Sequence, residues 1–399
     1  MSAVAPRTSG AVTLTRSQAR QLWNWTLSRH GLHPERRLSS VAEIAGAGLG
    51  IHAARLPSPF ATVLARAASP DVALALLTRQ QGLTTLRCMR KTLHLLPVDL
   101  AGVAHAATVH YRVRDAGRLA LNAGIPQSIL TSLTGQLTLL LANGPLLYRQ
   151  LEATLTGPRA SVAAVRVAVK LAWERGLLTY LNQSGCWNAE HRAFALTSDA
   201  HPDLDTALDP RAATRTLVHA YFTRYGPATL KDATWWSALS RAAVIAALDA
   251  SDTEWLQITT PWSQAPAYLA AAQYEEFLAA DPDSHATGLN LLAHEDVALK
   301  GYFETRDRYL MGLPPQQAFN QIGEALPTII LDGQIQGTWT WNPGTRTVTP
   351  AFTRGRASHA LTRRVSAATD TLTDALRTGW RDPTPAPAHR SPNQLALAI

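Results

Sequence analysis

A group of basic side chains lies in the segment 83–97, whose sequence is LTTLRCMRKTLHLLP. Arg87, Arg90, Lys91 and His94 alternate with apolar residues in what resembles a strand or a strand pair. Cations on one face of a strand are suited to contacts with DNA phosphates. A solvated strand face would have the same composition, so the segment predicts either phosphate binding or an ordinary exposed surface.

Two pairs of histidines lie close together in the sequence, which is the only feature that suggests metal ligands. His30 and His33 are separated by two residues and His105 and His110 by four, but no cysteine or carboxylate completes a metal set at either place. The segment GAGLG at 46–50 lacks the spacing of a dinucleotide-binding loop and follows a helical pattern rather than a strand. The sequence therefore predicts no metal site and no cofactor.

Other residues with possible chemistry have ordinary structural interpretations. His52 lies alone in the segment IHAAR, and a lone histidine is usually a hydrogen-bonded structural residue. Trp235 and Trp236 are interpreted as core anchors rather than as a platform for stacking bases. Trp187 is expected at the tip of a hairpin, where it would either wedge against DNA or lie partly exposed.

Composition limits the class of protein. Hydrophobic residues make up 46% and charged residues 17% of the 399 residues, which is enough apolar material for folded cores. The chain has no apolar stretch of about 18 residues and no apolar region in residues 1–10, so a membrane span and a standard secretion signal are not expected. Two cysteines exclude a disulfide scaffold. The net charge of +8 favours a polyanionic partner.

The clearest structural pattern lies in the middle of the chain. Two helical segments precede Ser161, which is a suitable N-cap for a third helix. This third helix has one apolar face and carries Arg166 and Lys170 on another. Strand-like segments follow at 177–181 and 192–197. Three short helices followed by a hairpin predict a winged helix-turn-helix, whose third helix would face DNA.

The flanking segments repeat this plan. Capping patterns begin helices after Thr15, Ser40, Thr229 and Ser240. Strand-like runs with Asp-Gly and Pro-Gly turn signals follow residue 285, and the segment 359–380 has the pattern of a closing helix. The sequence thus predicts three winged-helix units, and because such units bind either nucleic acids or other proteins, protein interaction stays open as an alternative.

The expected fold class is α+β, mainly α, with three tandem winged-helix units and a small C-terminal β-rich element. The expected boundaries are a flexible leader at 1–10, winged helix 1 at 11–125, winged helix 2 at 126–205, winged helix 3 with a β-rich extension at 206–380, and a Pro-rich disordered tail at 381–399.

Five segments in sequence order carry a family resemblance. They are LTRSQARQL at 14–22, RKTLHLLP at 90–97, RYGPATLKDATWWSAL at 224–239, LLAHEDVALKGYFETRDRYL at 291–310 and LDGQIQGTWTW at 331–341. In this order they resemble the bacterial tandem winged-helix family that includes the AlkZ and YcaQ DNA glycosylases. The resemblance covers roughly residues 12–380.

The resemblance implies three winged helices around a basic channel for duplex DNA, and excision of N-alkylated purines, including bulky and crosslinked adducts. The characterised members hold the attacking water with a Gln-x-Gln or Gln-x-Asp motif. The two motif positions fall here on His52 and Ala54. His52 can hold a water or act as a base, whereas the side chain of Ala54 cannot form a hydrogen bond. Farther along, Asp296 matches the family's aspartate.

These observations leave two main hypotheses. The first is a monofunctional DNA glycosylase of base excision repair that hydrolyses the N-glycosidic bond of N7- or N3-alkylated purines, with His52 orienting or activating water. The alternative, motivated by Ala54, is a non-catalytic DNA-binding regulator or lesion sensor. In both, the partner is double-stranded DNA, alkylated or crosslinked, and the protein is a cytoplasmic, nucleoid-associated monomer that needs no metal or cofactor. The expected DNA contacts are Arg55, Arg87, Arg90, Lys91, Thr92, His94, Arg166, Lys170, Arg306 and Arg308.

Overall fold

The computed structural model describes residues 5–78, 82–281 and 286–382, and it combines helices with strands in four small sheets. Part of the expected leader (1–4) and most of the expected tail (383–399) lie outside the described residues. Among the described helices, none combines the length and the apolar composition that crossing a membrane requires.

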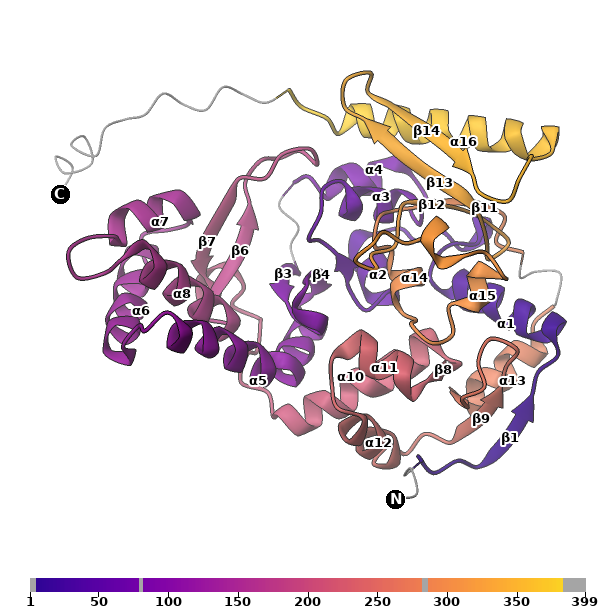
Figure 1. The fold of residues 1–399 in the computed structure, drawn as a ribbon, viewed down its shortest axis with the longest axis horizontal. Helices are drawn as coiled ribbons and strands as arrows, with labels where there is room; N and C mark the ends of the chain where they lie inside the picture. Colours follow the sequence, from indigo (N-terminus) through magenta and orange to yellow (C-terminus); the bar gives the residue numbers. More distant parts are fainter. Residues whose placement is uncertain (1–4, 79–81, 282–285, 383–399) are drawn as a thin grey trace.

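Residues 127–196 gather at one end of the molecule around their own hydrophobic core (Figure 1). The elements are α6 (Gln127–Leu141), β5 (Leu146–Leu147), α7 (Tyr148–Leu155), α8 (Val162–Glu174), β6 (Leu178–Asn182) and β7 (Arg192–Leu196). The side chain of Ser161 accepts a hydrogen bond from Ala164 N, so the predicted N-cap of α8 is confirmed. The two predicted strands pair as an antiparallel hairpin, and β5 adds a short third strand.

A long helix that the sequence did not predict, α5 (Val98–Asn122), connects this end to the rest of the molecule (Figure 1). It packs against both α8 and α10. Within it, the buried Arg112 donates to Glu174 Oε2 on α8 at 2.7 Å and to His105 Nδ1 at 3.1 Å. Arg87 donates to the other oxygen of Glu174 at 2.9 Å. One buried carboxylate therefore joins two separate parts of the fold.

The first part of the chain forms short helices around a three-stranded sheet of order β2-β4-β3. Its elements are β1 (Gly10–Thr13), α1 (Arg16–Arg29), α2 (Val41–Ala47), β2 (Ile51–His52), α3 (Ser58–Leu64), α4 (Pro70–Ala75), β3 (Leu83–Arg87) and β4 (Leu93–Pro97). The capping box at Thr15 and the N-cap at Ser40 are confirmed. Helix α3 was not predicted. The sequence pattern of residues 71–79 favours a helix, and α4 is present there but ends at Ala75; residue 79 lies outside the described residues.

The third part contains α10 (Pro210–Tyr225), β8 (Ala228–Thr229), α11 (Leu230–Ser237), α12 (Arg241–Asp249), β9 (Trp255–Thr259), β10 (Ala267–Ala270) and α13 (Ala271–Ala279). The capping box of Thr229 with Asp232 and the N-cap at Ser240 are confirmed. The N-terminal strand β1 joins this sheet in parallel with β9, with Gly10 opposite Leu256. Gly10, the last residue of the expected leader, is therefore part of a sheet.

The C-terminal strands β11 (Leu289–Leu292), β12 (Thr328–Leu331), β13 (Gln334–Asn342) and β14 (Thr347–Phe352) form one antiparallel sheet against α16 (His359–Thr378). The β-rich element was expected to belong to the third unit. Its sheet instead lies beside the short helices of the first part (Figure 1), and much of its core is shared with them, because Ile329 and Trp339 cluster with Ile44 and Phe60. The assignment by sequence order therefore missed a contact between residues nearly 300 positions apart.

Trp187 corrects a second expectation. It is buried rather than exposed at a hairpin tip, and its indole Nε1 donates to Leu376 O at 2.8 Å. Its ring meets those of Trp341 and Trp380 edge to face, with centroids 5.5 and 5.3 Å away. Trp187 thus joins the β6–β7 loop to the C-terminal helix and has no free face for DNA.

Candidate active site

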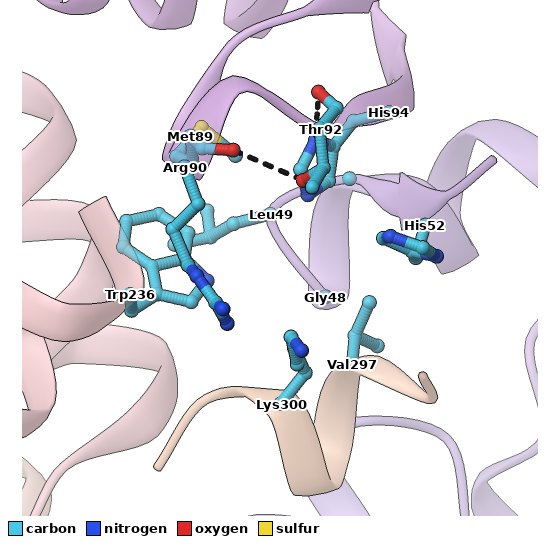
Figure 2. Close-up of a pocket in the computed structure, with 11 residues that line it drawn as sticks. Gly48, Leu49, His52, Met89, Arg90, Thr92, His94, Trp236, Val297 and Lys300 are labelled. Carbon is cyan, nitrogen blue, oxygen red and sulfur yellow. Dashed lines mark hydrogen bonds between the residues drawn. The ribbon is translucent and has the colours of Figure 1, made fainter. Parts of the chain in front are cut away.

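A pocket lies where the first sheet faces the short helix α14 (Val297–Lys300) (Figure 2). Its free volume is about 10 Å³, which is room for about one water molecule. Its lining comes from four separate stretches of the chain: Gly48, Leu49, Gly50, His52, Met89, Arg90, Thr92, His94, Trp236, Val297 and Lys300. Of the predicted site residues, His52, Arg90, Thr92 and His94 are brought together here.

Two histidines form one wall of the pocket. Strand β2 pairs with β4 so that His52 lies opposite His94, and their rings meet at right angles with centroids 5.8 Å apart. Burial lowers the pKa of His52 to about 3, and the positive charge of Lys300 acts in the same direction. Burial also lowers the pKa of His94 to about 3, and the neighbouring His52 is the next largest cause of this lowering. Both imidazoles are therefore neutral at pH 7.

The hydrogen bonds of these rings indicate which ring nitrogen carries the proton. His94 Nδ1 lies 3.1 Å from Thr92 O, and a neutral ring that faces a carbonyl must place its proton on that nitrogen. His94 Nε2 is then a hydrogen-bond acceptor. His52 Nδ1 is buried and has no hydrogen-bond partner among the described residues. A buried polar atom without a partner is costly, so it favours a bound water or ligand.

Two cations reach into the pocket from different sides (Figure 2). Lys300 ends α14 and pairs with the buried Glu295, and burial lowers the pKa of its amine. Arg90 comes from the turn between β3 and β4, where its φ is 52°. The Trp235 ring fixes both, because its centroid lies 3.7 Å from the guanidinium of Arg90 and 5.1 Å from the amine of Lys300.

A second polar group lies beside His52. Glu324 forms an ion pair with Arg55 at 2.9 Å and lies 3.5 Å from His294 Nε2. The charge of His294 acts to lower the pKa of His52 and the charge of Glu324 acts to raise it. Arg55 keeps about half of its side chain exposed, at 52%, so it can also contact a ligand in solution.

Buried ionic contacts hold the segment that carries Lys300. Asp296 accepts two hydrogen bonds from the guanidinium of Arg66, at 2.6 and 2.9 Å, and also caps α14 by accepting from Ala298 N at 2.9 Å. Asp296, which the resemblance singled out, therefore positions α14 and does not reach solvent. Beyond α14, Asp232 accepts from the backbone N–H groups of Phe303 and Glu304 at 2.7 Å each and fixes the following loop.

Several predicted DNA contacts lie outside the pocket. Arg166 is exposed on α8 and pairs with Glu152 at 2.6 Å, and Lys170 lies one turn farther along, partly exposed. Lys91 pairs with Asp115, and Arg87 with the buried Glu174. These side chains are not gathered at one place, so they define a broad surface rather than part of the pocket.

The two remaining arginines differ in accessibility. Arg306 lies partly exposed over the Phe319 ring, 4.1 Å from its centroid. Arg308 is fully buried, donates to Pro227 O at 2.7 Å and stacks 3.6 Å from the Tyr302 centroid. The prediction that Arg308 contacts DNA is therefore wrong, because its guanidinium is buried and contacts a backbone carbonyl and an aromatic ring inside the protein.

Sequence reasoning missed Lys300, Glu295, Arg66 and the cation-binding role of Trp235. No local spacing links these residues to His52, which precedes Lys300 by almost 250 positions. The prediction for the tryptophan pair is partly confirmed, since Trp236 is buried in the core, whereas Trp235 is only half-buried. Among the described residues, no group of three or more His, Cys, Asp or Glu side chains could hold a metal ion.

Comparison with known proteins identifies the fold and the family. A solved structure of the DNA glycosylase AlkZ from Streptomyces sahachiroi superposes with a TM-score of 0.73 at 21% identity, covering 91% of this chain and 98% of that one. The fold is thus that of a DNA glycosylase. No curated protein gives a significant match. The family model described as DNA glycosylase AlkZ-like matches residues 47–377, and the chain belongs to the AlkZ-like DNA glycosylase family.

Membership confirms the resemblance predicted from the sequence. It makes this chain a member of a family of DNA-repair glycosylases and makes DNA the substrate that the family implies.

Proposed function

We propose that the protein hydrolyses the N-glycosidic bond of N7- or N3-alkylated purines in duplex DNA, including bulky or crosslinked adducts, and that His52 orients the attacking water. The observation that carries this proposal is the neutral, buried His52 with one unpartnered ring nitrogen, at the position of the family's catalytic motif. A neutral imidazole can accept a hydrogen bond from water at one nitrogen and donate at the other.

The charge of the site suits the chemistry. An N7-alkylguanine is a cationic leaving group, and the sugar becomes oxocarbenium-like as the bond breaks, so the site must not add positive charge near the anomeric carbon. His52 and His94 avoid this because burial keeps both neutral. Lys300 is paired with the carboxylate of Glu295, whereas Arg90 keeps its positive charge and is held against the ring of Trp235. The two cations would bind phosphates that flank the target nucleotide.

We infer that a side chain from another strand replaces the missing second motif residue. Ala54 is exposed and supplies no polar side chain. His94, which is held opposite His52 and has an acceptor at Nε2, supplies one from the neighbouring strand. We infer that His52 and His94 together hold the water that a Gln-x-Gln motif would hold.

We further propose that the chain is organised as three winged helices, at 11–125, 126–205 and 206–380, that surround DNA as a monomer. The helix–helix–hairpin order of α7, α8, β6 and β7 supports this for the second unit. Under this proposal, Arg166 and Lys170 on α8 contact phosphates away from the lesion. The sheet β11–β14 belongs in part with the first unit, because the two share a core.

The proposal is tested by incubating the protein with duplex DNA that contains N7-methylguanine and cleaving the resulting abasic sites with alkali. We expect wild type and the matched control His110→Ala, an exposed histidine on α5, to release the base. We expect His52→Ala to be slower by about 10²-fold or more, the usual effect of removing one oriented hydrogen-bonding group. Equal rates for His52→Ala and His110→Ala would reject the role of His52.

A second candidate function has support from Ala54. A protein that binds lesions without cutting them would bind duplex DNA with an affinity that falls steeply with salt, yet release no base from any alkylated duplex. His52→Ala would then leave binding unchanged. Base release by wild type above the uncatalysed rate excludes this candidate.

A further inference from the structure

A short loop beside the pocket is held in one conformation by its own hydrogen bonds. Asn320 accepts through Oδ1 from the N–H groups of Ile322 and Glu324, at 3.1 and 2.9 Å. Its Nδ2 donates to Glu324 Oε2 at 2.8 Å, and its backbone N–H donates to Glu324 O at 2.9 Å. Phe319 and Ala325 form a β-bridge at the base of the loop. Because these bonds exist before any ligand arrives, the loop loses little entropy on binding.

The tip of this loop carries an exposed aliphatic side chain. Ile322 has 76% of its surface exposed, which is high for a β-branched hydrophobic residue. A single exposed hydrophobic residue is common on protein surfaces. What distinguishes Ile322 is that a rigid loop presents it next to a pocket for a polyanion.

Two observations place the loop at the pocket. Glu324, two residues after Ile322, pairs with Arg55, and the next residue, Ala325, donates its N–H at 2.6 Å to the Glu295 carboxylate that holds Lys300. At the base of the loop, the ring of Phe319 lies under the guanidinium of Arg306, 4.1 Å away. The loop that carries Ile322 therefore meets one arginine at Phe319 and another at Glu324.

On the basis of the proposed function, we propose that Ile322 is a wedge that enters the base stack beside the alkylated nucleotide, while Arg55 and Arg306 hold the phosphates on either side. Apolar side chains such as isoleucine separate base steps in this way, and unstacking a step costs free energy. Arginines that neutralise the adjacent phosphates offset this cost. The occupant of this surface is thus duplex DNA with a base pair weakened by alkylation.

The wedge explains how a narrow pocket could reach a nucleotide inside a duplex. The purine glycosidic bond is shielded while its base remains stacked. Opening one step next to the lesion would expose the anomeric carbon to a water held at His52. Ile322 would then act on the DNA and not on the reacting atoms, which makes it a positioning residue.

The test compares Ile322→Ala with Leu139→Ala, a control on α6 at the far end of the molecule with a similar exposure of 74%. Neither substitution should alter stability, since both side chains are exposed. With 2-aminopurine next to N7-methylguanine in a duplex, we expect fluorescence to rise on binding for wild type and Leu139→Ala, because the reporter loses its stacking. We expect little rise for Ile322→Ala, and recovery in Ile322→Leu.

Base excision supplies a second readout. Under single-turnover conditions, Ile322→Ala should be at least about tenfold slower on the duplex, whereas its rate on the same lesion in a single strand should match wild type. Equal behaviour of Ile322→Ala and Leu139→Ala in both assays, or no fluorescence change with wild type, would overturn the wedge. The fluorescence change requires DNA binding but no cleavage of the glycosidic bond. A fluorescence rise without base release would therefore reject only the glycosylase proposal. Base release without a fluorescence rise would reject only the proposal that Ile322 is a wedge.

Discussion

Replacing His30 by Gln should remove a specific part of the protein's sensitivity to acid. His30 follows α1 and has no exposed surface. Its Nε2–H donates to Arg224 O at 2.9 Å, its Nδ1 has no partner among the described residues, and its ring packs edge to face on Tyr225. Burial lowers the pKa of His30 to about 3, with the positive charge of Arg66 as the next cause.

The size of the effect follows from this pKa. An unfolded histidine has a pKa near 6.5, so between about pH 6.5 and pH 3 the unfolded chain binds a proton that the folded protein excludes. The stabilising contribution of the neutral His30 is therefore complete above pH 6.5 and is lost as the pH falls through this range. The loss approaches about 1.4 kcal/mol per pH unit and reaches about 2 kcal/mol at pH 5.

The assay is urea unfolding at pH 7.5 and pH 5.0 for wild type and His30→Gln. Glutamine can keep the donor to Arg224 O but does not titrate, so the free energy of unfolding of wild type should fall by about 2 kcal/mol more than that of the variant. Other buried histidines and carboxylates contribute equally to both proteins and cancel in this difference. Parallel losses in the two proteins would refute the reasoning.

Three further results are expected. Asp296→Asn should lower the free energy of unfolding by about 3–5 kcal/mol, because it leaves the buried Arg66 without its counter-charge, and a urea titration showing less than about 1 kcal/mol would contradict this. Arg166→Ala should lower the slope of log affinity for DNA against log salt concentration by about one, the value of one phosphate contact. Arg308→Met should destabilise the fold and leave this slope unchanged, because Arg308 is buried. Because burial raises the pKa of the Cys88 thiol to about 12, mass spectrometry should find Cys88 unmodified after iodoacetamide treatment of the folded protein at pH 8, and alkylation before unfolding would disprove it.

The sequence predicted features that depend on neighbouring residues. The caps at Thr15, Ser161 and Thr229 each involve a residue three positions away, so a short pattern is sufficient to identify them. The β6–β7 hairpin likewise depends on two strands with a polar loop between them. Helix α5 was missed because its small residues give only a weak amphipathic pattern.

The sequence could not predict which residues meet across the chain. His52 and His94 were both identified, but only the register of β2 on β4 shows that they face each other. Lys300 joins them because the buried pair of Arg66 and Asp296 holds α14 against the first part of the fold. Arg308 looked like a surface cation because burial depends on contacts that no local spacing reveals.

The way in which the two ends of the chain interlock also constrains its synthesis. Strand β1 pairs with β9, and the core around Ile44 and Phe60 includes Ile329 and Trp339. When a ribosome has made the first hundred residues, the partners of these side chains do not yet exist. At about 5–20 residues per second, the nascent chain would wait roughly 15–60 s with this apolar surface uncovered. The core of the first part can therefore close only after the C-terminal strands have been made, and during that interval its apolar surface would be a substrate for chaperones.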